Sequence, residues 1–172
     1  MNMTEEGMLQ GVAHVRPGKG RSLWVLGELV RRKTTSDQTG GAYSLFEVTS
    51  QPGTGPPPHV HHREEEAFWV LEGEYEFLIE GRTLTAITGS LIYFPKGILH
   101  AHRVVGESVG RMLLTQTPGG LYERFFEEVG MPADGKAGPL AFEDQPDAGR
   151  IMKVAAGYGI EIPGPITGCR RA

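Results

Sequence analysis

The stretch from residue 66 to residue 116 is a succession of short strand-like segments that glycine and proline interrupt repeatedly. Glu80-Gly81 separates two of them and is a candidate two-residue hairpin turn, because glycine adopts a positive φ without steric cost. No helical pattern lies between the segments, which favours an antiparallel sandwich or barrel over βαβ units. The expected strands are 66–71, 74–79, 82–87, 90–94, 99–105 and 111–116.

The flanking sequence extends this pattern and then changes character. Apolar runs predict further strands at 23–26, 28–31 and 42–49. An amphipathic helix is expected at about 121–130 and a second at about 146–156, starting near Pro146. The tail after Gly157 is expected to lie over the surface. The sequence therefore predicts one mainly β domain over 1–172, with a barrel at about 13–116 and a helical segment at about 118–172.

Composition excludes several classes of partner. The formal net charge is −4 and the pI is near 5.9, whereas nucleic-acid binding needs a basic surface. No apolar run approaches the roughly 20 residues of a membrane helix, and the start, MNMTEEGMLQ, lacks the basic and apolar pattern of a signal peptide. Cys169 is the single cysteine, so no intrachain disulfide is expected. We expect a cytoplasmic protein with no nucleic-acid or membrane partner.

Histidine is concentrated in two segments, 53–73 and 89–104. Together they contain five of the six histidines: His59, His61, His62, His100 and His102. Histidine is the commonest metal ligand among side chains. The clustering therefore indicates a metal site.

The spacing within these segments resembles the paired motifs of the cupin superfamily. In the first, Gly53 is followed by five residues, His59, one residue, His61, four residues, Glu66, six residues and Gly73. In the second, Gly89 is followed by five residues, Pro95, one residue, Gly97, two residues and His100. Val104 stands where the family often has an asparagine that is not a ligand. The resemblance implies a mainly β, jelly-roll barrel with two short C-terminal helices.

The same resemblance implies that His59, His61, Glu66 and His100 bind a divalent transition metal. Fe, Mn, Co, Ni, Cu and Zn all suit such ligands, and the sequence does not choose among them. Strand geometry agrees, because His59 and His61 are two residues apart and face the same way. Glu65 is the alternative to Glu66 as the carboxylate ligand. The rest of the acidic run Glu64-Glu65-Glu66 is expected to be solvated, and His62 is expected to be exposed.

Other residues near the motifs are candidates for contacts with substrate or ligands. His102 has the parity of His100, so it should point inward. Phe68 and Tyr75 are candidate pocket residues. Tyr93, like most apolar residues of these strands, is expected to be in the core.

A closer resemblance covers nearly the whole chain, through PPPHVHHREEEAFWVLEGEYEF, YFPKGILHAHRV, TPGGLYERFFEEVG and YGIEIPGP. These segments resemble single-domain bacterial cupins related to quercetin 2,3-dioxygenase. That implies an oxidoreductase that cleaves a flavonol-like or other enolisable aromatic substrate with O₂. Glu66 is then the expected catalytic residue, as acceptor of the substrate hydroxyl proton.

Two alternatives stay open. One is a cupin isomerase, cyclase, lyase or decarboxylase that uses the metal without O₂. The other is a cupin that binds a small ligand without catalysis. In each case we expect a homodimer, because barrels of this kind expose edge strands that pairing can cover.

Overall fold

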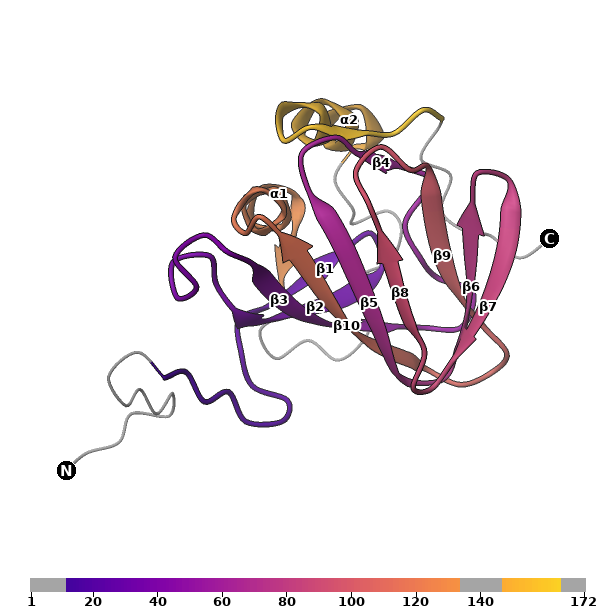
Figure 1. Cartoon of the computed structure of the whole chain (residues 1–172), viewed down its shortest axis with the longest axis horizontal. Helices are drawn as coiled ribbons and strands as arrows, with labels where there is room; N and C mark the ends of the chain where they lie inside the picture. Colours follow the sequence, from indigo (N-terminus) through magenta and orange to yellow (C-terminus); the bar gives the residue numbers. More distant parts are fainter. Residues whose placement is uncertain (1–11, 134–146, 165–172) are drawn as a thin grey trace.

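The computed structural model describes residues 12–133 and 147–164, which form the expected mainly β fold with two helices (Figure 1). The helices are α1 (Leu121–Val129) and α2 (Ala148–Gly157). The strands are β1 (Ser22–Val25), β2 (Glu28–Thr34), β3 (Ser44–Ser50), β4 (Val60–His61), β5 (Glu65–Glu72), β6 (Glu74–Ile79), β7 (Arg82–Ile87), β8 (Leu91–Phe94), β9 (His100–Val105), β10 (Gly110–Thr117), β11 (Met131–Pro132) and β12 (Ile160–Glu161).

The strands pair antiparallel in three sheets. The largest has seven strands in the order β11-β1-β2-β3-β10-β5-β8, the second has the order β7-β6-β9, and β12 pairs with β4. Backbone hydrogen bonds within the described ranges do not close these sheets into one continuous barrel. Helix α1 contacts β1 and α2, and α2 contacts β12. No helix in the described ranges is long and apolar enough to span a membrane.

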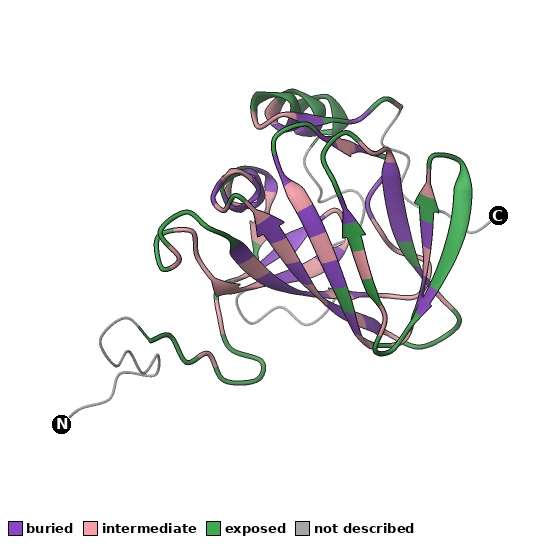
Figure 2. Cartoon of the chain, in the orientation of Figure 1, coloured by how far each residue is buried: buried purple, intermediate pink, exposed green. Residues whose placement is uncertain are grey.

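The core lies between the inner faces of the two larger sheets. Along β5, Glu66, Phe68 and Val70 are buried whereas Trp69 between them is 51% exposed, as strand alternation requires (Figure 2). The Phe68 ring meets Phe77 of the second sheet at a centroid distance of 5.5 Å. Glu66, Phe68 and Val70 of β5 therefore point toward the interior.

The hairpin expected at Glu80-Gly81 joins β6 to β7. Both turn residues have positive φ, 47° for Glu80 and 81° for Gly81, and Ile79 pairs with Arg82. Positive φ at both central positions matches the right-handed twist of the flanking strands. The turn thus sets the register of the outer hairpin.

The C-terminal tail corrects one expectation. Instead of lying over the surface, Ile160 and Glu161 pair with His61 and Val60, and the side chains of Ile160 and Ile162 are buried. Helix α2 begins at Ala148 with the Asp147 side chain accepting from the Arg150 N–H. Pro146, where this helix was expected to start, lies outside the described residues.

Tyr93 also departs from expectation, because it is 57% exposed rather than in the core. It pairs with Ala67 on the outer face of the seven-stranded sheet, whereas Ile92 and Phe94 point inward.

Candidate metal centre

Backbone pairing brings the two histidine segments together. His59, just before β4, and His100, the first residue of β9, form a bridge in which each N–H donates to the other carbonyl, at 2.9 and 3.0 Å. Their rings lie 4.4 Å apart between centroids. His61, two residues further on, faces the same way, with its ring 5.0 Å from that of His59. His59 and His100, which are 41 positions apart in the sequence, thus become neighbours.

The four expected ligands form one compact group. Each of His59, His61, Glu66 and His100 offers one ligand atom, and these atoms all lie within 4.8 Å of one another. All four side chains are buried. Neither Glu65, the alternative carboxylate, nor His62, whose side chain is 52% exposed, belongs to this group.

Two of the imidazoles are oriented by the backbone in the same way. Nδ1 of His59 lies 2.9 Å from the Pro57 carbonyl, and Nδ1 of His100 lies 2.9 Å from the Ile98 carbonyl. A carbonyl only accepts, so each Nδ1 carries the proton and donates it. The Nε2 lone pair of each ring is left for another partner, an arrangement typical of metal-binding histidines.

Buried polar atoms without partners converge at the centre of this group. Nε2 of His61, Nε2 of His100 and Oε2 of Glu66 make no hydrogen bond with any described residue. Oε2 of Glu66 lies 2.6 Å from His100 Nε2, and Oε1 lies 3.3 Å from His61 Nε2. Unsatisfied buried polar groups are costly, and a shared cation would satisfy all of them. The donor set therefore fits a divalent metal.

The protonation states of His59 and Glu66 agree with this. Burial, followed by the charges of His100 and His61, lowers the pKa of His59 to about 3, so its ring is neutral at neutral pH. Burial alone would raise the pKa of Glu66, but the neighbouring imidazoles outweigh it and lower the pKa. The pKa of His61 is lowered by burial, yet the carboxylates of Glu66 and Glu64 raise it overall. A neutral imidazole at His59 and a carboxylate at Glu66 are the forms that a metal requires.

Two polar residues that the sequence reasoning missed support the group. Gln116 on β10 is fully buried, and its Nε2 donates to Oε1 of Glu66. Glu64 is also buried, against the expectation that the acidic run beside Glu66 would be solvated. Both occupy inward positions. Glu64 is two residues before the inward-facing Glu66, and Gln116 continues the buried alternation of Met112 and Leu114 along β10. A polar residue at an inward position was the signal that could have found them.

A small cavity adjoins the candidate metal ligands. Its volume is about 20 Å³. Most of its lining is apolar, and its polar contributors are His59, Glu28, His102 and Tyr122. Of the expected pocket residues, Phe68 and His102 line this cavity, whereas the fully buried Tyr75 does not.

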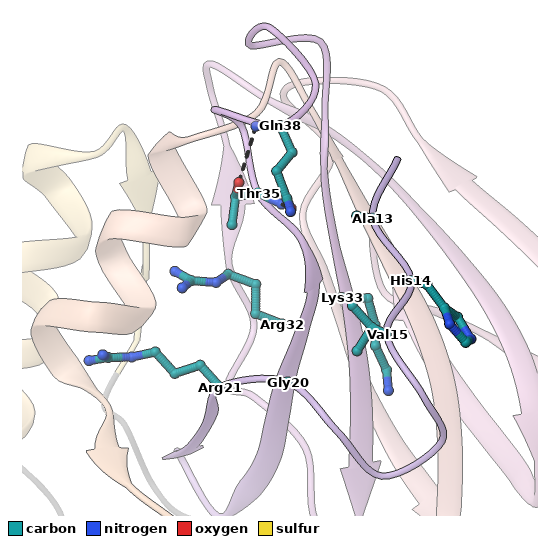
Figure 3. A pocket seen from close by; sticks show the side chains of 9 residues that line it. All are labelled: Ala13, His14, Val15, Gly20, Arg21, Arg32, Lys33, Thr35 and Gln38. Atoms are coloured by element: carbon teal, nitrogen blue, oxygen red, sulfur yellow. Dashed lines mark hydrogen bonds between the residues drawn. The ribbon is translucent and has the colours of Figure 1, made fainter. Parts of the chain in front are cut away.

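A second hollow lies on the outside of the molecule, where residues 13–15 and 20–21 run beside β2 (Figure 3). It is lined by basic side chains, but they do not converge. Arg21 pairs with Glu127, Arg32 with Glu123 and Glu127, and Lys33 with Glu47. Figure 3 shows Arg21 and Arg32 directed toward helix α1, away from His14. These cations are neutralised within the protein and make no anion site.

Comparisons with known proteins place this geometry among relatives. A family model described as a cupin domain matches residues 46–115. The quercetin 2,3-dioxygenase of Bacillus subtilis is 23% identical over 142 residues, which cover 83% of this chain and 42% of that protein. The chain spans less than half the length of the curated relatives that it matches.

Solved structures share the same fold. A predicted oxalate decarboxylase from Thermotoga maritima superposes with a TM-score of 0.57 at 17% identity, covering 61% of this chain and 98% of that one. The polyketide cyclase from Streptomyces resistomycificus gives a TM-score of 0.56 at 22% identity, with 64% and 80% covered. At such identities the likeness extends to the fold alone.

Proposed function

We propose that this chain, which has the jelly-roll fold of the cupin superfamily, is a metal-dependent dioxygenase of a flavonol-like or other enolisable aromatic substrate. One observation carries the proposal. Four buried ligand atoms lie within 4.8 Å of one another beside a mainly apolar cavity. The similarity to a quercetin 2,3-dioxygenase along 83% of the chain supports the choice of substrate class.

In this proposal His59, His61, Glu66 and His100 hold the metal, with Fe, Mn, Co, Ni, Cu and Zn all compatible with three imidazoles and one carboxylate. When bound, the metal supplies Lewis acidity that acidifies a substrate hydroxyl, and open positions for substrate and O₂. The bonds from Pro57 and Ile98 to the two Nδ1 atoms keep His59 and His100 oriented toward the centre. Little reorganisation is then needed when substrate binds.

Glu66 has two roles in this proposal. It is a ligand, and it is the nearest carboxylate to accept the proton of the substrate hydroxyl. Gln116 holds Oε1, which leaves Oε2 facing the imidazoles. The lowered pKa of Glu66 keeps it ionised and makes it a weak base, so it accepts a proton only from a hydroxyl that has itself been acidified.

Turnover of quercetin by reconstituted protein tests the proposal. Protein freed of metal is loaded separately with Fe, Mn, Co, Ni, Cu and Zn, and flavonol absorbance and O₂ uptake are followed. We expect loss of both with at least one metal, and loss of that activity in His100→Ala but not in Glu65→Gln. No consumption of flavonol or O₂ with any metal contradicts the proposal.

A non-oxidative reaction at the same centre is the second candidate, as an isomerase, cyclase, lyase or decarboxylase. The observation that favours it is a further buried carboxylate, Glu28, in the same cavity, because proton transfer without O₂ uses such a group. Turnover that persists under anaerobic conditions would identify it. A cupin that only binds its ligand would keep binding in Glu66→Gln and show no turnover at all.

We also propose that the active form is a homodimer. Trp69, Leu91 and Tyr93 are 51%, 61% and 57% exposed on the outer face of β5 and β8, where Trp69 pairs with Leu91. Exposed aromatic residues grouped in this way are typical of interfaces. Light scattering should give twice the chain mass, and Trp69→Glu should shift it to one chain mass. A monomeric wild type excludes the dimer.

A further inference from the structure

A second cluster of buried polar side chains lies in the cavity that adjoins the metal ligands. Glu28 is on β2, Ser50 on β3 and His102 on β9. The Ser50 hydroxyl donates to Oε1 of Glu28 at 2.5 Å, and Nε2 of His102 lies 3.2 Å from the same oxygen. All three side chains are buried, with exposures of 7% for Glu28, 0% for Ser50 and 6% for His102. Two donors from other strands thus fix one oxygen of a carboxylate in the interior.

The other oxygen of Glu28 lacks a comparable partner. Across residues 12–133 and 147–164, Oε1 makes two hydrogen bonds and Oε2 makes none, and Oε2 does not belong to the fully buried unpaired atoms, so it remains accessible. Burying a carboxylate is costly unless its oxygens are hydrogen-bonded. A hydrophobic residue at this inward position would stabilise the fold better. The Glu28 carboxylate is therefore better suited to binding a ligand through Oε2 than to stabilising the core.

The cluster and the metal ligands belong to one cavity. The same space is lined by His59 on one side and by Glu28 and His102 on another. His100 and His102 are two residues apart on β9, so their positions differ by roughly 7 Å along the strand. The centroid of the Phe68 ring lies 6.4 Å from that of His100 and 5.4 Å from that of His102. A ligand that contacts both the candidate metal ligands and Glu28 must therefore pack an apolar part against Phe68.

We propose that Glu28 is a substrate-binding residue that accepts a hydrogen bond from a hydroxyl group of the substrate, remote from the oxygen that binds the metal. Ser50 and His102 are positioning residues, because each fixes the carboxylate through Oε1. This inference rests on the proposed function, since it takes the metal-binding end of the substrate from there. It narrows the substrate to a compact molecule with a hydroxy-ketone at one end, an apolar body and a free hydroxyl several ångströms away.

Binding of two matched probes to Co²⁺-loaded protein tests the inference without turnover. The probes are 3-hydroxyflavone and its 4′-hydroxy derivative, which differ only in a hydroxyl remote from the chelating oxygens. Anaerobic titration is followed by the Co²⁺ absorption bands, which report a new ligand at the metal. We expect wild type to bind the hydroxylated probe about tenfold more tightly, since a hydrogen bond to a charged group contributes that much.

Two variants test whether Glu28 causes the preference for the hydroxylated probe. Glu28→Gln should reduce it to about twofold or less with the affinity for 3-hydroxyflavone little changed, and Ser50→Ala should reduce it partly. Glu47→Gln is the matched control, because Glu47 has the same 7% exposure but lies outside this cavity. Its preference should equal that of wild type. Thermal unfolding and cobalt content, measured for every variant, identify any that fail to fold, and Ser50→Ala then decides.

The outcomes separate the two proposals. If neither probe changes the Co²⁺ bands of wild type, the metal-centred function fails and the inference with it. If both probes bind wild type equally, or if Glu28→Gln and Ser50→Ala keep the full preference, the role of Glu28 is wrong while the metal-centred function stands.

Discussion

Glu64 connects helix α1 to the candidate metal ligand His61. Oε1 of Glu64 accepts a hydrogen bond from the backbone N–H of Tyr122 at 2.9 Å, in the first turn of α1. Oε2 lies 3.6 Å from Nδ1 of His61 and has no hydrogen-bond partner in the described ranges. Tyr122 in turn packs edge-on against the His61 ring, with centroids 4.9 Å apart. One carboxylate thus both accepts a hydrogen bond from the first turn of a helix and faces a candidate metal ligand.

Substitutions at Glu64 should separate these two roles. Glu64→Gln keeps an acceptor for the Tyr122 N–H but removes the charge near His61, so we expect roughly tenfold weaker metal binding with little loss of stability. Glu64→Ala removes both and should also cost about 1 kcal/mol of unfolding free energy. Chelator competition and thermal unfolding measure the two effects. Glu65→Gln, next in sequence and outside the group, is the control, and equal metal affinities for it and Glu64→Gln would exclude a role for Glu64.

Metal removal should lower thermal stability. A ligand that binds only the folded state, at a hundred times its dissociation constant, contributes about 2.7 kcal/mol to the unfolding free energy. We expect a lower Tm after dialysis against a chelator and recovery when metal is restored. His59→Ala, His61→Ala and His100→Ala should show neither change. Identical melting curves for chelated and metal-loaded wild type would contradict binding by this group.

Glu47 should make stability depend on pH. Burial raises its pKa, but Lys33, Arg31 and Arg111 outweigh this and lower it below the ordinary value of 4.5. Its carboxylate lies 2.8 Å from Arg31 and 3.2 Å from Lys33. Because the pKa is lower in the folded state, the stabilisation is full above the ordinary pKa and is lost as the pH falls through the folded value.

The comparison of wild type with Glu47→Gln measures this stabilisation. At pH 7 the variant should be less stable by about 1 to 2 kcal/mol, and the difference should shrink below about pH 4. Glu72→Gln removes the 58% exposed partner of Arg111 and should change little, since exposed pairs contribute little. If the difference in unfolding free energy between wild type and Glu47→Gln grew as the pH fell, the pKa of Glu47 would be raised rather than lowered by folding.

Two glycines of the first motif should respond differently to alanine. The Gly53–Gly55 loop is hydrogen-bonded to β9 through Val104. A Cβ at Gly55 would lie 1.8 Å from the His102 carbonyl oxygen, so Gly55→Ala should cost about 3 kcal/mol. A Cβ at Gly53 meets nothing within 4 Å, and only its φ of +75° opposes alanine, at about 1 kcal/mol. Denaturant unfolding of both variants tests the order of the two costs.

Alternation and turn chemistry allowed much of the fold to be predicted. The strands that flank Glu80-Gly81 form as expected, because Gly81 adopts a positive φ without steric cost and β6 alternates buried with more exposed residues. Alternation was less useful where the outer face is also apolar. Tyr93 was misplaced for this reason, since its hydrophobicity looks the same on either face.

The candidate site was predicted only in part. Motif spacing named the four grouped side chains, but it could not reveal Glu64, Gln116 or Glu28. Their importance depends on contacts between strands distant in sequence, such as the 50 positions that separate Gln116 from Glu66. The pairing of the tail with β4 was missed for the same reason. Two residues are too few to give a strand pattern, and their partner is about 100 positions away.

The pairing of β4 with β12 has a consequence for the order in which the protein is made. His61 sits on a strand of two residues, supported at Ile160 and by the bond from the His62 N–H to the Gly159 carbonyl. Synthesis proceeds from the N-terminus, so a nascent chain can collapse its larger sheets while this support is still missing. The strand that carries His61 is completed only after residues 159–161 have left the ribosome. If the proposed metal binds through His61, its capture then follows the synthesis of residues 159–161.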